Sequence, residues 1–494
     1  MRLRILCLFL FVAVCLRADL ACPPIFGDHM VLQRDLPVAV WGTAEPAATV
    51  TVRFAAQEKV TTADADGRWL VRLDALPASA EPRELSISAL NRDSRIENRK
   101  FRDVLVGEVW FCSGQSNMEK QLGPRRGQQP TDHYQEELTR ADCPPLRLFQ
   151  GLHALKPKEG DVTLVWRPCS AESLTTMEFS AAAYYFGREL VRELGVPVGL
   201  IHSSFGGTRI EAWMPPAAFA FNPALRGLES ATYDSWVKGV QATELYAVRV
   251  TPYVPFTLRG WLWYQGEANV MNAEHLEYAA KMRALIASWR AAWGRPDAPF
   301  YFAQLAPFTY SRIKVWPKQL TGDSLPALWE AQVAALDVPH TGLIPTTDLV
   351  ANVKDIHPTN KRDVGLRFAR LALAETYGKA VAAQATRFQT MRRPVFSKKL
   401  ELAFTSAAGL RSRDGQPLTH FQIAGPDRKF HPADAVIKNG KVIVSSPSVA
   451  KPVAVRFAWD ETANPNLVNA AGLPALPFRT DDWPLVLEVP KEAK

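Results

Sequence analysis

The sequence lacks the features that would point to nucleic acid, a metal ion or a membrane as a partner. Its 58 Lys and Arg are interspersed among 50 Asp and Glu, so the formal charge of +8 forms no basic run. Without such a run we expect no nucleic-acid partner. No spacing of Cys and His is typical of a zinc site. Beyond the N-terminus no run is long and apolar enough for a transmembrane helix, so we expect no integral membrane segment.

The N-terminus carries an apolar run of a different kind. Two arginines precede Ile5–Leu16, and small residues follow as far as Ala21. Charged, apolar and small-residue segments in this order are typical of a secretory signal peptide, which we predict over residues 1–21. The protein is accordingly expected to be secreted or periplasmic. Cys22 follows directly, so lipid anchoring through Cys22 remains an alternative.

Cysteine is scarce. The chain has six cysteines, and removal of the signal peptide would leave four. Cys112 lies in an apolar run and is expected to be a buried thiol. Cys143 and Cys169 are a candidate disulfide in an oxidising compartment.

The remaining chain divides into three regions by pattern. Residues 23–100 hold short strand-like runs separated by turns, which is typical of a sandwich-like β-rich domain. Residues 101–385 alternate strands with helices, which predicts an α/β domain whose mostly parallel sheet has helices on both faces. The β pattern returns over residues 388–494, either packed with the N-terminal β region or standing alone. The main elements expected in the α/β domain are strands Val104–Cys112, Leu146–Leu152, Val198–His202, Leu258–Tyr264, Phe300–Leu305 and Gly342–Thr347, and helices Ala181–Leu194, Glu274–Trp293, Leu325–Leu336 and Arg362–Tyr377.

A serine follows the first strand of the α/β domain. The apolar run Val104–Cys112 ends at small and polar residues, and a helix start is expected from Asn117. A turn of this kind would lift Ser116 out of the sheet edge and place its hydroxyl beside unpaired helical N–H groups. An acyl-transfer nucleophile needs that arrangement, because its transition state is an oxyanion. The alternative is that Ser116 or Asn117 only caps the helix.

Two further loops follow strands of the same sheet. Gly206 and Gly207 come soon after strand Val198–His202, and paired glycines let backbone N–H groups approach a ligand. Gln265, Glu267 and Asn269 follow strand Leu258–Tyr264. Gln265 and Asn269 are neutral amide donors suited to an oxyanion. Functional groups of a parallel sheet gather at the carboxyl ends of its strands, so these loops are expected to meet Ser116.

A histidine is the expected base. His357 follows strand Gly342–Thr347 and precedes the last long helix. A hydroxyl nucleophile needs a base that is neutral near pH 7, and that base needs an acid on its other ring nitrogen. Asp355 lies two residues before His357, and Asp348 lies nine before it. The alternative reading of His357 is an ordinary surface residue.

Taken in order, these motifs resemble the sialate O-acetylesterase family of the SGNH hydrolase superfamily. The resemblance begins at Phe26–Gln33 and reaches Pro484, and it includes Gly-Gln-Ser-Asn-Met at 114–118, Phe-Gly-Gly-Thr at 205–208, Gln-Gly-Glu at 265–267 and Asp-Ile-His-Pro at 355–358. It implies an SGNH-hydrolase-like three-layer α/β/α domain, flanked here by two β-rich regions. It also implies a reaction that needs no cofactor.

The resemblance assigns roles residue by residue. Ser116 matches the nucleophile, with its own N–H as one oxyanion donor, and His357 matches the base. Gly206 or Gly207 matches the glycine donor, and we choose Gly207. Gln265 stands where the superfamily usually has an asparagine, which leaves the choice between Gln265 and Asn269 open. The superfamily's acid lies three residues before the histidine, where this chain has Lys354, so Asp355 is the expected orienter and Asp348 the alternative. Glu267, Trp213 and Asn117 are expected to bind substrate.

The sequence therefore predicts a secreted carbohydrate O-acetylesterase that acts through a Ser-His-Asp acyl-enzyme mechanism on an O-acetylated sugar or glycan. The first expectation for the substrate is an O-acetylated sialic acid. An alternative is an acetylesterase of plant cell-wall polysaccharide, xyloglucan or xylan, on whose sugars Trp213 and Trp263 would stack. For these tryptophans, core packing is the competing interpretation. An alternative of another class is a non-catalytic glycan-binding protein.

Overall fold

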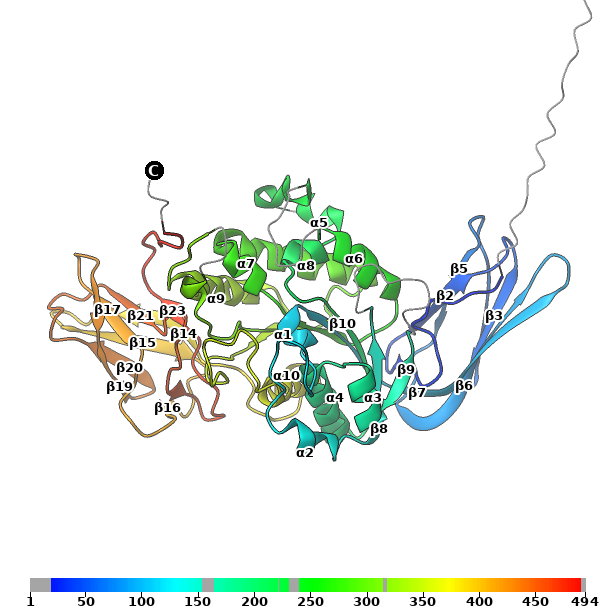
Figure 1. Cartoon of the computed structure of the whole chain (residues 1–494), viewed down its shortest axis with the longest axis horizontal. Helices are drawn as coiled ribbons and strands as arrows, with labels where there is room; N and C mark the ends of the chain where they lie inside the picture. The colour runs from blue at the N-terminus through cyan, green and yellow to red at the C-terminus, as the bar shows by residue number, and fades with distance from the viewer. Residues whose placement is uncertain (1–18, 153–163, 221, 231–239, 314–317, 490–494) are drawn as a thin grey trace, which may run out of the picture.

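The structure is a computed structural model that describes residues 19–152, 164–220, 222–230, 240–313 and 318–489. An α/β region lies at the centre of an elongated molecule, and a β-rich region lies at each end (Figure 1). The two β-rich regions are therefore on opposite sides of the centre and do not pack on each other. Nearly all of the expected signal peptide lies outside the described residues.

The central sheet has the strand order β13-β12-β11-β7-β10-β8-β9. Neighbouring strands are parallel from β13 to β8, and β9 is an antiparallel edge strand. Strands β10, β11 and β12 are buried along their whole length, as expected for a sheet covered on both faces. The strands are β7 (Ile96–Gly114), β8 (Cys143–Gln150), β9 (Trp166–Cys169), β10 (Val198–Ser204), β11 (Gly260–Tyr264), β12 (Phe300–Ala303) and β13 (Thr341–Ile344).

Helices cover both faces of this sheet. In Figure 1, α4 and α10 lie below the sheet, whereas α8 and α9 lie above it. Close packing of α10 on α4 depends on Gly365, because a Cβ at this position would lie 2.5 Å from the Cβ of Tyr185. The four long helices predicted from periodicity are all present, as α4 (Ala181–Leu194), α8 (His275–Trp293), α9 (Ser324–Ala334) and α10 (Arg362–Glu375). Among the described residues, no helix is long and apolar enough to cross a membrane.

Strand β7 joins the N-terminal β-rich region to the central sheet. It has 19 residues, whereas the apolar run predicted only nine of them. Its first part pairs with β6 (Ser79–Leu90), its middle pairs with β1 (Val31–Gln33), and its last residues pair with β10 and β11. One strand therefore runs through both regions without a break.

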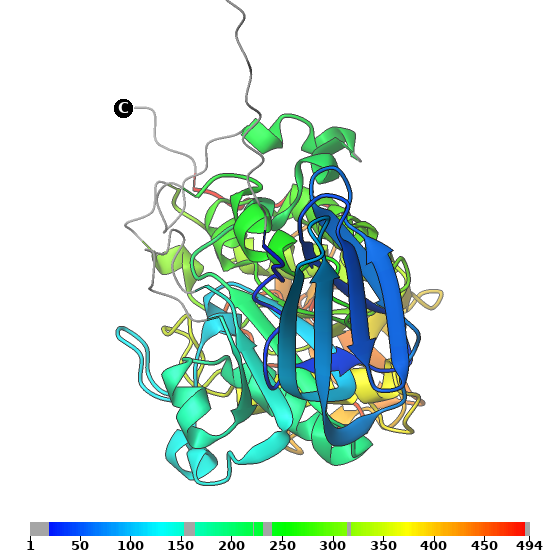
Figure 2. The same cartoon turned by 90° about the vertical axis from the view of Figure 1, so that its right-hand side faces the viewer.

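The N-terminal region is built from strands with one buried face. Residues alternate between buried and exposed along β3 and β5, which is the pattern of a half-buried strand. Strands β1 and β2 are separated by a turn in which Asp35 has a positive φ of 59°. Figure 2 shows the strands of this region side by side at the end of the molecule. They are β2 (Val38–Thr43), β3 (Thr49–Phe54), β4 (Gln57–Thr62), β5 (Arg68–Leu73) and β6.

The C-terminal region consists mainly of two four-stranded antiparallel sheets. It is fixed to the centre by polar contacts: Arg479 lies 3.0 Å from Glu330 of α9, and Glu461 accepts a hydrogen bond from the Ser311 N–H at 2.9 Å. One sheet contains β14 (Arg387–Arg392), β15 (Lys399–Thr405), β20 (Lys441–Ser445) and β19 (Asp434–Lys438), and the other contains β18 (Phe430–Pro432), β17 (Phe421–Ala424), β21 (Ala454–Phe457) and β23 (Phe478–Arg479).

The cysteines of the central region lie where the sequence suggests. Cys112 is fully buried in β7. Cys143 and Cys169 are direct cross-strand partners in β8 and β9, and both are free thiols in this structure. The register thus leaves these two residues side by side at the sheet edge.

Candidate active site

The four loops singled out in the sequence meet at one cavity. Because β7, β10 and β11 are parallel neighbours, their carboxyl ends lie at the same edge of the sheet. The cavity there has a volume of about 570 Å³. Its wall includes residues from the loops after β7, β10, β11 and β13, namely Ser116, Gly206, Gly207, Glu267 and His357. Residues separated by more than two hundred positions in the chain therefore face one space.

Ser116 is the first residue of the short helix α1 (Ser116–Glu119). The residue that caps this helix is Gln115, whose carbonyl accepts the Met118 and Glu119 N–H groups at 2.9 Å each. Ser116 therefore does not cap the helix. Its side chain is half-buried and has no hydrogen-bond partner in the described part of the chain, so its hydroxyl is available to a ligand in the cavity.

The two neighbours of Ser116 hold its turn in place. The Gln115 side-chain oxygen accepts hydrogen bonds from the Gly266 N–H at 3.2 Å and from the Gln265 amide at 3.1 Å. The Asn117 amide nitrogen donates to Glu267 at 2.5 Å and to the Ile356 carbonyl at 3.0 Å. Asn117 is 1% exposed, so the prediction that it binds substrate is corrected: its amide is used inside the protein.

Gly206 lies directly against the turn that carries Ser116. A Cβ at this position would lie 3.3 Å from the Ser116 Cβ and 2.9 Å from a Glu119 oxygen. The Gly206 N–H donates to that same carboxylate at 3.1 Å, and Arg125 binds the other oxygen of Glu119 at 3.1 Å. Gly207 has a φ of 69°, which favours glycine. The first glycine thus permits the close approach, and the second permits the turn.

His357 reaches the cavity from the loop before α10. Its backbone N–H donates to Asp355 at 2.9 Å, but its ring makes no hydrogen bond to Ser116, to Asp355 or to any other described residue. Asp355 therefore fixes the loop through the backbone, and the predicted carboxylate–imidazole bond is not formed in this structure. Burial, reinforced by Lys361 and Lys120, lowers the pKa of His357 from 6.5 to about 4, so the ring is neutral at pH 7.

Asp348, the alternative acid, has another partner. Its two carboxylate oxygens accept hydrogen bonds from Arg367 of α10 at 2.7 and 2.6 Å. A bidentate pair of this kind is strong and fixes the geometry of both side chains. Asp348 thus secures α10 to the loop after β13, and the structure shows no contact between it and His357.

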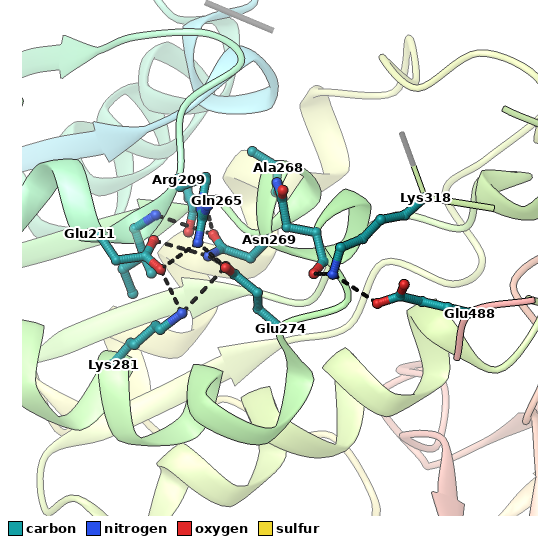
Figure 3. A network of polar contacts seen from close by, with 11 residues as sticks. Arg209, Glu211, Gln265, Ala268, Asn269, Glu274, Lys281, Lys318 and Glu488 are labelled. Carbon is teal, nitrogen blue, oxygen red and sulfur yellow. Dashed lines mark hydrogen bonds and ion pairs between the residues drawn. The ribbon is translucent and has the colours of Figure 1, made fainter. Parts of the chain in front are cut away.

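Gln265 and Asn269 lie behind the cavity wall, in a buried polar network (Figure 3). The Gln265 amide nitrogen lies within hydrogen-bond distance of the Thr208 carbonyl at 3.0 Å and the Asn269 side-chain oxygen at 2.7 Å. The Asn269 amide nitrogen donates to Glu211 at 3.1 Å and to Glu274 at 2.7 Å. Both side chains are fully buried, and their amide N–H groups already have these acceptors inside the protein. The expectation that one of them donates to the oxyanion is therefore corrected.

Comparisons with known proteins show the family to which the chain belongs. Residues 106–374 match the family model described as "Carbohydrate esterase, sialic acid-specific acetylesterase". The chain belongs to this family. A sialate O-acetylesterase of Homo sapiens is 31% identical over 383 residues, which cover 71% of this chain and 70% of the human protein. A sialate O-acetylesterase of Rattus norvegicus is 26% identical and covers 87% and 88% of the two chains.

A solved structure extends the likeness to nearly the full length. The crystal structure of a carbohydrate acetylesterase from Xanthomonas citri is 34% identical, covers 94% of this chain and 100% of its own, and has a TM-score of 0.80. The resemblance inferred from the four motifs is therefore confirmed. The protein is a carboxylic ester hydrolase of the carbohydrate esterase type.

Besides Asn117, the side chains expected to bind substrate are Glu267 and Trp213, and of these two only Glu267 is among the described residues that line the cavity. Glu267 lines the wall, and the oxygen that does not contact Asn117 is buried without a hydrogen-bond partner in the described structure. Burial raises the pKa of Glu267 above its ordinary value, against the bond from Asn117. Trp213 is fully buried and packs edge-on against Trp263 at 5.8 Å. The stacking expected of these tryptophans is wrong, and core packing is their role.

The rim of the cavity contains residues that the sequence reasoning missed. Arg125 and Arg126 come from a turn after α1, whereas Phe308 and Ile313 come from the segment after β12. Neither segment carries one of the four motifs. Only the fold shows that they border the esterase site.

Proposed function

We propose that this esterase removes O-acetyl groups from sugars, with Ser116 as the nucleophile and His357 as the general base. The observation that carries the proposal is the shared cavity, in which an unpartnered serine hydroxyl and a neutral histidine lie beside a glycine loop. Bonds between catalytic side chains are often long or absent before substrate binds, so the open Ser116–His357 geometry is compatible with this role.

The proposed reaction has two halves. In the first, the Ser116 oxygen attacks the acetyl carbonyl carbon while His357 takes the hydroxyl proton, and the sugar oxygen then leaves with that proton. In the second, water attacks the acetyl-enzyme, His357 takes its proton and returns it to Ser116, and acetate is released. The chemistry needs no external reactant other than water.

The oxyanion is assigned to backbone donors. The Ser116 N–H stands at the first position of α1, and Gly206 and Gly207 lie on the adjacent loop. For the second donor we keep Gly207, whose loop lines the cavity beside Ser116. Asp355 remains the proposed acid of the triad, and it would need to turn from the loop backbone to the ring when substrate binds.

We also propose that the central region is an SGNH-hydrolase-like α/β/α domain. The support is the parallel sheet with helices on both faces and a nucleophile on the turn after its central strand β7. The arginines and apolar run of the first 16 residues support export of the protein by a signal peptide.

For the substrate we propose an O-acetylated sialic acid. The family description supports this choice, and the Arg125 and Arg126 side chains on the rim could pair with the carboxylate of an acidic sugar. Acetate release should be compared on O-acetylated sialic acid and on acetylated xyloglucan and xylan. Acetate release from the polysaccharides alone would show that the substrate is a plant cell-wall polysaccharide. Glycan binding without any acetate release would indicate a non-catalytic binding protein.

Replacement of the nucleophile tests the mechanism. We expect Ser116→Ala to lower kcat/KM for an acetyl ester by at least about a thousandfold, because the acyl-enzyme cannot form. Ser113→Ala is the matched control, since Ser113 lies three residues earlier on β7 and its hydroxyl donates to the Ser203 carbonyl at 2.7 Å. Near-normal hydrolysis by the Ser116 variant would refute the assignment.

A further inference from the structure

A buried lysine lies behind the cavity and has no role in the reaction as described so far. Lys361 stands at the start of α10, four residues after His357, and is 1% exposed. Its Nζ donates to the Asn117 side-chain oxygen at 2.7 Å and lies 5.3 Å from the centre of the Tyr264 ring. No carboxylate among the described residues forms an ion pair with it. Burial of a cation without an ion-pair partner is costly, so a buried lysine at this position calls for a reason.

The partner of Lys361 connects three walls of the cavity. The Asn117 oxygen accepts from Lys361, which directs the amide nitrogen of the same side chain to the opposite side. That nitrogen donates to Glu267 and to the carbonyl of Ile356, the residue before His357. A reversed amide would present an oxygen to two acceptors and the NH2 group to a cation. Lys361 therefore specifies the one orientation of Asn117 in which all these bonds form.

We propose that Lys361 is a positioning residue of the esterase. By holding the Asn117 amide in one orientation, it keeps the nucleophile turn, the Glu267 carboxyl and the His357 loop in register. It does not line the cavity itself, so it acts on the reacting groups through its hydrogen bond to Asn117 and through its charge. The proposal rests on the proposed function, because it assumes that Ser116 and His357 perform the reaction.

The charges around Lys361 come from several elements. Glu267 of α7 (Glu267–Met271) and Asp355 of the His357 loop favour its charged form, whereas Lys120 after α1 opposes it. Burial is the largest influence, and together these groups lower the pKa of Lys361 from 10.5 to about 7. The neutral amine formed above that pH can still donate to Asn117, so the hydrogen bond survives the loss of charge.

The same cation acts on the histidine. After burial, Lys361 is the strongest influence that lowers the pKa of His357, followed by Lys120 and, more weakly, Arg125, while Asp355 opposes them. Removal of the Lys361 charge should therefore raise the pKa of His357. Because the base must be neutral, activity would then be lost at a higher pH as the solution is acidified. A lysine that only filled space would leave this pH limb where it is.

The test compares Lys361→Met with Lys354→Met, an exposed lysine of the same loop, on 4-nitrophenyl acetate. We expect Lys361→Met to lower kcat by about ten- to a hundredfold with KM within about threefold, as misplaced reacting groups do. The acid limb of kcat/KM should rise by about one pH unit. Lys354→Met should match the wild type in both respects.

A second variant covers the case in which Lys361→Met does not fold. Asn117→Asp keeps the size of the side chain but cannot donate to Glu267 or to the Ile356 carbonyl, so it should show the same loss of kcat. A kcat within twofold of wild type in both variants, or a loss in Lys361→Met with an unmoved acid limb, would overturn the proposal. Ser116→Ala is assayed alongside: activity there would refute the proposed function itself, whereas its inactivity beside a normal Lys361→Met refutes only the role of Lys361.

Discussion

Each residue of the segment Gln115–Asn117 has a different task, and only one of the tasks could be predicted. The passage from an apolar strand through a polar turn to a helix places Ser116 by local pattern alone. Gln115 and Asn117 serve it through contacts with residues near 266 and 356. No local pattern carries information on such distant partners. The sequence therefore suggested substrate binding for Asn117, whereas in the fold its amide holds Glu267 and the Ile356 carbonyl.

The titration of His357 gives a prediction at the same scale. Because burial and nearby cations lower its pKa to about 4, the ring stays neutral as the pH falls from 7 to about 5. We expect kcat/KM for a small acetyl ester to be nearly constant over that range and to fall by half near pH 4, where the ring takes up a proton. A pH–rate profile measures this directly. A limb near 6.5, the ordinary value, would contradict the environment described here.

The two amides after β11 show why polar residues at a strand end are ambiguous. Their chemistry suits an oxyanion, and the sequence correctly places them close to the site. Their acceptors, however, are the Thr208 carbonyl, Glu211 and Glu274. Whether an amide faces a cavity or a buried carboxylate depends on which elements pack behind it, and that is settled by the tertiary fold.

At the scale of elements, periodicity was a good guide to helices and a weaker one to strand ends. Helix α4 has the predicted bounds, and α8 and α10 differ from prediction by one and two residues at one end each. Long amphipathic or buried helices have many residues that repeat one signal. The N-terminal half of β7 has exposed, charged residues, and its pairing with β6 compensates for the missing apolar pattern.

Helix α8 is fixed to the loop after β10 by four charged residues drawn in Figure 3, whose charges balance: Arg209, Glu211, Glu274 and Lys281. Lys281 of α8 contacts Glu211 at 2.5 Å and Glu274 at 3.3 Å, and Arg209 pairs with the same two carboxylates. Burial opposes ionisation of Glu211, but Lys281 and Arg209 hold its pKa below the ordinary value. Glu211 therefore depends on these two cations for its charged state.

Loss of Lys281 should consequently destabilise the fold. We expect Lys281→Met to lower the free energy of unfolding at pH 7 by about 3–5 kcal/mol, because a buried carboxylate is left without its partner. Lys318→Met is the control, since the Lys318–Glu488 pair at 2.8 Å is about 40% exposed and should be worth roughly 1 kcal/mol or less. Urea denaturation of both variants measures the difference, and equal losses would show that the network is not the stabilising feature.

For the whole molecule, the sequence could name three regions but could not arrange them. The C-terminal β-rich region contacts the centre through single residues far apart in the chain. The Glu461 carboxylate accepts a hydrogen bond from the Ser311 N–H, and the Glu461 backbone carbonyl accepts one from the Phe308 N–H at 2.9 Å. No repeated pattern marks such contacts. The arrangement nevertheless reaches the site, because Phe308 lines the cavity.

A substitution in the C-terminal region should therefore alter substrate binding. Glu461→Ala removes the carboxylate that accepts hydrogen bonds from Ser311, whereas the Phe308 N–H keeps its bond to the Glu461 backbone carbonyl. We expect this variant to loosen the segment that carries Phe308 and to raise KM about tenfold, the equivalent of roughly 1.4 kcal/mol, with kcat within about twofold. Asp460→Ala is the matched control, because the exposed Asp460 carboxylate accepts hydrogen bonds from Thr462, two residues later in the same region. Steady-state kinetics on one acetyl ester compare the two. A fall in kcat at constant KM would place Glu461 in the chemistry instead.

The unbroken course of β7 has a practical consequence for attempts to trim the enzyme. The last residue of this strand, Gly114, is two positions before the nucleophile, and its first residues belong to the outer β-rich region. A shortened protein that began within β7 would lose the pairing of this strand with β6 and β1, and so part of the support for the turn that carries Ser116. At the opposite end the chain leaves α10 at Glu375 and enters β14 only at Arg387, so a cut there would interrupt no strand, but it would remove the contacts of Glu461 with the segment that carries Phe308.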